Sequence, residues 1–290
     1  GTARSQSSKE EYIVNFSNVL DPGSLRLVIN TIDLSQPDSV HLRCSVIDQD
    51  GRHVSGLAPS TALPTLWSTV LERYTDGGVK LDDFRVNEVR NDSAPAFSSM
   101  FVIDYSASMS EDITTVLLAL VKVTGMWRPA LDDYSIIQFD QRVKTALYRA
   151  TDRDAIESLI PFYKLGGMTA FYSASQRGIR DIAASEKDRV VILVTDGVDN
   201  ASTLSANDVV REARTANARM YIIGLAHADK PVLEQIAGQT GGRLYFPNRA
   251  TELDSIFTNI YLMNNLYYNV SYARPAGGNL REAEVQLTLP

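Results

Sequence analysis

Cysteine and histidine are scarce in this chain, which limits the chemistry that it can support. It has one cysteine, Cys44, and three histidines among 290 residues. A single cysteine excludes an internal disulfide framework, and its place in an alternating apolar and polar stretch, residues 40–47, predicts a buried thiol in a strand. The histidines, His41, His53 and His227, lack the spacing of metal ligands or of a catalytic pair.

Long apolar runs and basic runs are missing as well. No segment approaches the roughly 18 uninterrupted apolar residues of a membrane-spanning helix. The chain has 28 Lys and Arg against 35 Asp and Glu, a net charge of −7, and an acidic chain without basic runs is not expected to bind nucleic acid. It begins Gly1-Thr2 rather than with Met, which we interpret as a processed or truncated product.

The first third of the chain has the pattern of a β-rich domain. Residues 1–10 are polar and aperiodic, and we expect a disordered tail there. Residues 11–95 contain short alternating stretches separated by turn residues, which predicts a β-sandwich; the clearest are Leu25–Ile29, Val40–Val46 and Phe84–Val89. Ser60–Tyr74 departs from this pattern, because its apolar residues recur at helical spacing, and we expect a short helix there.

Strand and helix patterns alternate between residues 97 and 265. This alternation predicts βαβ crossovers and a doubly wound, mostly parallel sheet, an α/β fold of Rossmann-like type. Residues 266–290 return to a period of two, with strands expected at Leu266–Tyr272 and Glu282–Leu289. Two strands are not stable alone, so we expect them to complete the β-sandwich, with the α/β unit inserted into it.

A candidate ligand site follows the first buried strand of the α/β unit. The apolar run Met100–Ile103 ends at Asp104, and Ser106 and Ser108 follow at alternate positions before a helical pattern begins. In open α/β sheets, ligands bind beyond the carboxyl ends of the strands. One carboxylate and two hydroxyls offer only oxygen, which suits a hard divalent cation.

Two further loops offer oxygen atoms in the same way. Thr169 lies in a Gly-Gly-Met-Thr segment before a helix, and Asp196 follows a second buried strand. The predicted metal ligands are therefore Asp104, Ser106, Ser108, Thr169 and Asp196. Two carboxylates and three neutral hydroxyls leave a cation electrophilic and partly hydrated, which favours Mg²⁺, with Mn²⁺ or Ca²⁺ as alternatives, and leaves room for an Asp or Glu of a partner protein.

These three motifs, in this order, resemble the metal-ion-dependent adhesion site of von Willebrand factor A domains. The resemblance covers about residues 97–265. It implies a doubly wound sheet with one antiparallel edge strand, which we expect at Val143–Tyr148. The flanks are similar to the immunoglobulin-like sandwich that accompanies this domain in bacterial proteins: Asp82–Glu88 resembles the segment before the domain and Tyr268–Tyr272 the closing strand. The expected helix near Trp67 departs from that pattern.

Residues around these motifs suggest a second ion and a ligand rim. Glu111 and Asp112 resemble acids that hold a second ion in integrin β-type A domains. Acids in the first turn of a helix are also stabilised by the helix dipole, which explains them equally well without an ion. The residues expected to border the site and contact a ligand are Met168, Tyr172, Asp199 and Asn200.

The sequence therefore predicts a metal-dependent protein-binding or adhesion module, extracellular, at the cell surface or periplasmic, rather than an enzyme. An alternative is an intracellular A domain that docks on an ATPase, as in chelatase-type complexes. A metal-dependent hydrolase is disfavoured because no His or Lys accompanies the site motifs as a base.

Overall fold

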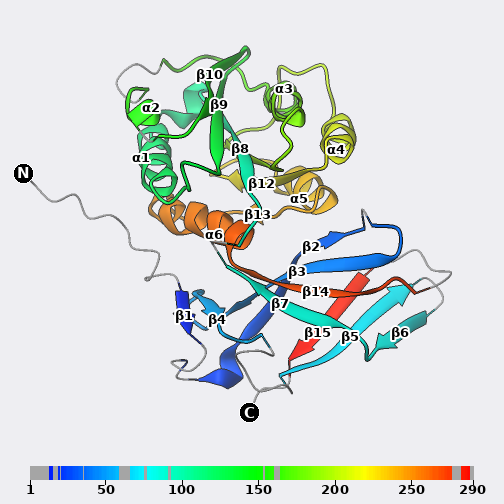
Figure 1. The fold of residues 1–290 in the computed structure, drawn as a ribbon. Coiled ribbons are helices and arrows are strands. Elements are labelled where there is room, and N and C mark those ends of the chain that lie inside the picture. Colours follow the sequence, from blue (N-terminus) through cyan, green and yellow to red (C-terminus); the bar gives the residue numbers. More distant parts are fainter. Residues whose placement is uncertain are drawn as a thin grey trace, which may run out of the picture. The chain divides into compact units, whose positions relative to one another are not determined.

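A computed structural model describes residues 13–15, 19, 21–34, 36–58, 66–74, 77–90, 93–152, 154–159, 164–275 and 282–287 (Figure 1). The tail predicted at residues 1–10 lies outside them. The chain divides into two units, one built on Pro95–Ile260 and the other on Ser7–Ala94 with Tyr261–Pro290. We describe each unit by itself.

The first unit contains a six-stranded sheet in the order β10-β9-β8-β11-β12-β13. Its strands are β8 (Phe97–Asp104), β9 (Asp133–Phe139), β10 (Val143–Ala150), β11 (Asp188–Thr195), β12 (Ala218–Gly224) and β13 (Leu244–Tyr245). All neighbours are parallel except β10, which pairs with β9 in antiparallel register. The prediction of a mostly parallel sheet with an antiparallel edge strand at Val143–Tyr148 is confirmed.

Helices cover both faces of this sheet (Figure 1). They are α1 (Ile113–Thr124), α2 (Asp154–Glu157), α3 (Phe171–Ala183), α4 (Ala206–Thr215), α5 (Lys230–Gln239) and α6 (Leu253–Asn265). Met100 and Val102 of β8 pack in one core with α3, α4 and α5, whereas Phe101 between them contacts Trp127 and Phe257 on the other face. Every residue of β8 is buried, as expected for a central strand covered on both sides.

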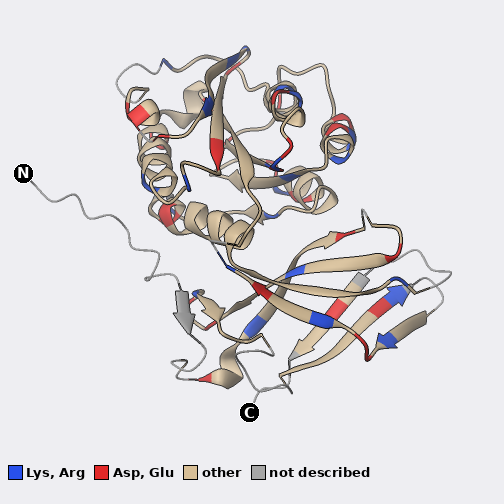
Figure 2. Cartoon of the chain, in the orientation of Figure 1, with Lys and Arg blue, Asp and Glu red and all other residues tan. Residues whose placement is uncertain are grey.

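The surface of α3 and α4 carries charges of both signs (Figure 2). Arg180 of α3 pairs with Glu212 of α4 at 3.0 Å, and Arg177 pairs with Asp181 one turn along α3 at 2.7 Å. None of the helices in the described part of the chain has the length and apolar character needed to cross a membrane.

The second unit contains two sheets built from both ends of the chain. One has the order β1-β4-β3-β14-β7, with β2 also paired to β3, and the other has the order β15-β5-β6. Their strands are β1 (Ile13–Asn15), β2 (Arg26–Asp33), β3 (Ser39–Ile47), β4 (His53–Ser55), β5 (Trp67–Tyr74), β6 (Gly77–Leu81), β7 (Arg85–Val89), β14 (Tyr267–Ala273) and β15 (Glu282–Leu287). The last two strands of the chain, β14 and β15, each pair with strands from its first ninety residues.

The two sheets of this unit share one hydrophobic core. Leu42 of β3 and Val70 of β5 are fully buried in it, together with Val270 of β14. The Trp67 and Tyr268 rings lie 5.1 Å apart, and the Trp67 indole donates a hydrogen bond of 2.7 Å to the Leu57 carbonyl. That this pair of sheets is the immunoglobulin-like sandwich expected from the sequence stays a prediction.

The helix predicted at Ser60–Tyr74 is wrong for the part that the structure describes. Residues 67–74 form strand β5, and residues 60–65 lie outside the described residues. Val70 and Leu71 pair with Val285 and Glu284 of β15. Pairing with a strand more than 200 residues away decides the structure here, and local spacing carries no sign of it.

Cys44 gives a test of this core. Its side chain is fully buried, and burial raises the pKa of the thiol to about 12. At pH 8 only about one thiol in ten thousand is therefore ionised, and the thiolate is the nucleophile. We expect the folded protein to resist alkylation by iodoacetamide and the urea-unfolded protein to take up one label. Fast labelling without denaturant would contradict the buried position of β3.

Candidate metal-ion site

Asp104 is the last residue of β8 and is completely buried. One of its carboxylate oxygens accepts a hydrogen bond of 2.8 Å from the Ser106 backbone N–H. The other accepts a bond of 2.6 Å from the Thr195 hydroxyl at the end of β11. Since β8 and β11 pair in parallel register up to Ile103 and Val194, the next residue of each strand reaches the same sheet edge.

This edge is where the connections from neighbouring strands diverge. The chain leaves β8 through α1 to reach β9 on one side, and β11 lies on the other side of β8. Such a switch point leaves a crevice beyond the strand ends, where open α/β sheets bind their ligands. The position of Asp104 thus follows from the topology of the sheet.

Ser106, Ser108 and Asp196 form a chain of short contacts at this edge. The Ser106 and Ser108 hydroxyl oxygens lie 3.1 Å apart, and the Ser108 hydroxyl donates a bond of 2.8 Å to Asp196 Oδ1. Ser106 and Asp196 are buried, whereas Ser108 is exposed. The first and third motifs therefore meet, although 88 residues separate Ser108 from Asp196.

The loop that carries Thr169 is bonded to both of the other loops. The Gly166 N–H donates to the Tyr105 carbonyl at 2.8 Å. The Thr169 N–H donates to the Asn200 side-chain oxygen at 2.8 Å, and the Asn200 N–H returns a bond of 2.9 Å to the Thr169 carbonyl. A Cβ at Gly197 would lie 3.2 Å from the Thr169 hydroxyl oxygen. The structure thus brings all five predicted ligands to one end of the sheet.

The two carboxylates of this cluster are poorly compensated by basic groups of the chain. Burial raises the pKa of Asp104 to about 6, against the lowering effect of its bonds to Thr195 and Ser106, and the nearby Asp196 charge raises it further. Burial also raises the pKa of Asp196, with a further contribution from Asp112. Among the described residues, no Lys or Arg forms an ion pair with either carboxylate, and the charge of His227 lowers the pKa of Asp196 against these effects. Buried charges without a partner are costly, and a metal ion is one of the few groups that compensates them.

The donor set fits a hard divalent cation. It consists of carboxylate and hydroxyl oxygens, the ligands that Mg²⁺, Mn²⁺ and Ca²⁺ prefer. Within the described ranges, no group of three or more His, Cys, Asp or Glu side chains is arranged to hold a metal. Any ion at this edge would therefore depend on the hydroxyls as well as on the two acids.

Glu111 and Asp112 lie between the 3₁₀ turn Ala107–Ser110 and α1. Asp112 occupies the N-cap position of α1, but its side chain makes no capping hydrogen bond. Its charge acts on Asp196 instead and raises the pKa of that carboxyl. Glu111 is exposed. A second ion at these acids stays a prediction.

Two of the four predicted rim residues have a role inside the protein. Asp199 Oδ2 accepts a bond of 2.8 Å from the Tyr172 N–H, so it caps the first turn of α3. Asn200 fixes the Thr169 loop, as described above. Met168 is 46% exposed, and Val198, which the sequence analysis did not single out, is 52% exposed. These two apolar side chains therefore lie at the surface beside the predicted ligands Thr169 and Asp196.

Thr195 contacts this cluster, and the sequence motifs did not point to it. It ends an apolar run, where a threonine is common in any buried strand. Its contact with Asp104 depends on the pairing of β8 with β11. The sequence could have revealed it only if the ends of these two strands had been aligned with each other.

We expect Thr195→Val to lower the free energy of unfolding in EDTA at pH 8 by about 1.5–3 kcal/mol, because a buried charge-assisted hydrogen bond is lost without a change of side-chain shape. Urea unfolding followed by tryptophan fluorescence measures this. Thr195→Ser keeps the hydroxyl and loses one methyl group, at a cost of about 1 kcal/mol. Equal stability of the valine variant and the wild type would show that the Asp104 bond contributes nothing.

Comparisons with known proteins agree with this fold. Residues 100–259 match the family model of the von Willebrand factor type A domain. An aerotolerance-related membrane protein from Bacteroides fragilis superposes with a TM-score of 0.51 at 15% identity, over 58% of this chain and 98% of that one. Proximal thread matrix protein 1 from the mussel byssus, in a structure with a zinc-occupied MIDAS motif, superposes with a TM-score of 0.52 at 17% identity.

The second of these covers 65% of this chain, which spans about half of the mussel protein. At such low identities the solved structures show a shared fold. No curated protein sequence is similar enough to count as a match. The family model covers more than half of the chain and includes all five candidate ligands. The chain belongs to the von Willebrand factor type A domain family.

Proposed function

We propose that this protein is a metal-dependent protein-binding module. A divalent cation held by Asp104, Ser106, Ser108, Thr169 and Asp196 would accept a carboxylate from a protein partner. The observation that carries the proposal is the pair of buried carboxylates with which no described Lys or Arg forms an ion pair. Three hydroxyl-bearing residues adjoin them on loops that are hydrogen-bonded to one another.

Mg²⁺ suits this set best, with Mn²⁺ and Ca²⁺ as alternatives. Two carboxylates balance the charge of a divalent ion, and the neutral hydroxyls add no further negative charge. An ion here therefore stays more electrophilic than in a cage of many carboxylates, retains water and can exchange it for an external anion. The mussel byssus protein of the same fold holds zinc at its MIDAS motif, which supports a divalent ion at this position of the fold. The ion would supply a Lewis-acidic point for the partner's Asp or Glu.

The surface around the five residues suits a protein partner. Met168 and Val198 are exposed apolar side chains within two residues of predicted ligands in the chain, and apolar contacts around a charged anchor exclude water from it. We expect such a site to bind its ligand rather than turn it over, because the hydrogen bonds described for the cluster come from hydroxyls and backbone N–H groups, and His227 acts on Asp196 only through its charge. We place the protein outside the cytoplasm, at a cell surface or in a periplasm; the fold of the Bacteroides fragilis membrane protein supports this. An intracellular A domain docked on an ATPase is the alternative.

Metal binding is tested by calorimetric titration of EDTA-treated protein with Mg²⁺, Mn²⁺ and Ca²⁺. We expect one site in the wild type, and none with Asp104→Asn or Asp196→Asn, because an amide removes one of the two charges. At an ion concentration of about 100 times Kd, binding adds about 2.7 kcal/mol to stability, a rise of roughly 5–10 °C in the melting temperature of a unit of this size.

The matched control is Asp254→Asn, which removes an acid that is 41% exposed and paired with Lys122. It should retain the ion affinity and the thermal shift. In EDTA, Asp104→Asn should be at least as stable as the wild type, because it removes a buried charge that has no cation beside it. Equal ion affinity of Asp104→Asn and the wild type would overturn the metal assignment.

Partner binding is tested by capture from an extract of the native host on immobilised protein. We expect a protein that is retained in Mg²⁺, released by EDTA, and not retained by Asp104→Ala, whereas Asp254→Asn retains it. Replacement of the partner's contacting Asp or Glu by its amide should abolish capture. Retention that is indifferent to EDTA would assign the interaction to another surface.

A further inference from the structure

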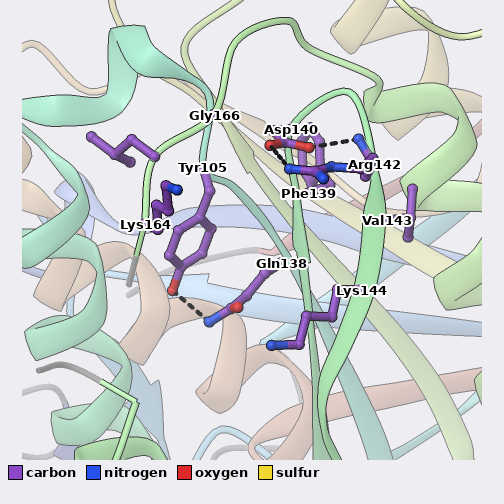
Figure 3. A pocket seen from close by; sticks show the side chains of 10 residues that line it. Tyr105, Gln138, Phe139, Asp140, Arg142, Val143, Lys144, Lys164 and Gly166 are labelled. Atoms are coloured by element: carbon purple, nitrogen blue, oxygen red, sulfur yellow. Dashed lines mark hydrogen bonds and ion pairs between the residues drawn. The ribbon is translucent and has the colours of Figure 1, made fainter. Parts of the chain in front are cut away.

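A cavity of about 480 Å³ lies beside the candidate ion site, within the same unit (Figure 3). Its walls come from the β9–β10 hairpin and from the loop that leads to Thr169. The polar side chains that line it are those of Tyr105, Gln138, Asp140, Arg142, Lys144 and Lys164. The volume is in the range of cavities that hold ligands of many atoms, well above what one small ion fills.

The polar side chains in this cavity are mostly hydrogen-bond donors and cations. Gln138 Nε2 donates to the Tyr105 hydroxyl oxygen at 3.1 Å, so these two polar side chains are joined in the cavity wall. Lys144 and Lys164 are exposed and form no ion pair with any described residue. In Figure 3 their ammonium groups lie on two sides of the Tyr105–Gln138 pair.

One carboxylate lines the cavity, that of Asp140, and it already interacts with Arg142. Asp140 accepts a hydrogen bond of 2.6 Å from the Arg142 N–H and lies 3.7 Å from the Arg142 guanidinium. A Cβ at Gly166 would come within 1.8 Å of Asp140 Oδ2, so the loop packs directly on this acid. Three cations against one acid leave a formal excess of two positive charges, in a chain whose net charge is −7.

This cavity shares backbone with the candidate ion site. Tyr105 stands between the predicted ligands Asp104 and Ser106 and lines the cavity with its side chain. Gly166, at the cavity wall, pairs with Ser106 as an isolated parallel bridge and donates its N–H to the Tyr105 carbonyl. The Tyr105 Cα lies about 3.8 Å from the Cα atoms of Asp104 and Ser106, so the two places are close enough for one extended peptide of a few residues to contact both.

We infer that the cavity binds acidic residues of the partner, in the same segment that supplies the carboxylate to the ion. This inference rests on the proposed function and adds to it the chemical class of the ligand, an acidic peptide segment. Separated lysines on β10 and on the Thr169 loop match several carboxylates along a chain better than a single phosphate, which needs its donors at one point. The cationic surface raises affinity and association rate for such a segment, and salt weakens it.

The test uses two labelled peptides of equal length and fluorescence anisotropy in Mg²⁺ at low ionic strength. Both carry one central Asp among Gly and Ser residues, and the second also has Glu residues on both sides. We expect wild type to bind the Glu-flanked peptide about tenfold more tightly than the single-Asp peptide. Lys144→Gln/Lys164→Gln should reduce this preference to less than about twofold without changing the affinity for Mg²⁺.

The matched control is Lys122→Gln/Lys230→Gln, which removes the same charge from exposed positions on α1 and α5. It should keep the preference of the wild type. Equal affinity of the wild type for the two peptides, or equal loss in both double variants, would overturn the inference.

The outcomes separate this inference from the proposed function. If Mg²⁺ and Asp104 are needed for both peptides but the cavity lysines have no effect, the ion site stands and the inference is wrong. If the lysines govern binding of the Glu-flanked peptide even in EDTA, the cavity assignment stands and the ion role fails. Binding of inorganic phosphate that depends on Lys144 and Lys164, with no preference between the peptides, would assign the cavity to a small anion and overturn the peptide inference.

Discussion

The hydrogen bond from the Thr195 hydroxyl to the Asp104 carboxylate joins the two central strands, β8 and β11, at their carboxyl ends, where the candidate ion site lies. A carboxylate in this position is withdrawn from water, and the cost of its charge appears as a pKa raised to about 6 by burial. A fold retains such a group only where something compensates its charge. The two hydrogen bonds that it accepts compensate in part and fix both of its oxygens. The rest of the site depends on this fixed, incompletely compensated charge.

The surrounding loops hold the other oxygen donors at the same edge by bonds between segments distant in sequence. Asn200 exchanges two hydrogen bonds with Thr169, and Asp199 caps the first turn of α3. The Gly166 N–H attaches the Thr169 loop to the backbone at Tyr105. Donors that are positioned before a ligand arrives lose little conformational entropy on binding. Asp199 and Asn200 are thus used for positioning, and Ser108, Met168 and Val198 are among the exposed side chains around the site.

Much of the first unit could be predicted from the sequence because its elements are local patterns. Apolar runs that end in Asp104 and Asp196 indicate buried strands followed by loops, and parallel strands place their carboxyl ends at one edge. The role of Thr195 could not be predicted in this way, because it depends on which strands are neighbours. Residues 67–74 were mistaken for helix for the same reason: their partner, β15, lies at the other end of the chain. The cavity beside Tyr105 was also invisible, since its lysines come from a strand and a loop that the fold brings together.

A metal ion that accepts a carboxylate confers little selectivity by itself, because every protein offers Asp and Glu on its surface. Selectivity must therefore come from groups that contact the residues on either side of the bound acid. On this chain those groups differ in character: exposed apolar side chains at Met168 and Val198, and a cationic cavity behind Tyr105. Since Tyr105 lies between two predicted ion ligands, any shift of its backbone changes the ion site and the cavity together. The shared backbone makes recognition of the flanking acids and ligation of the central acid parts of one binding event.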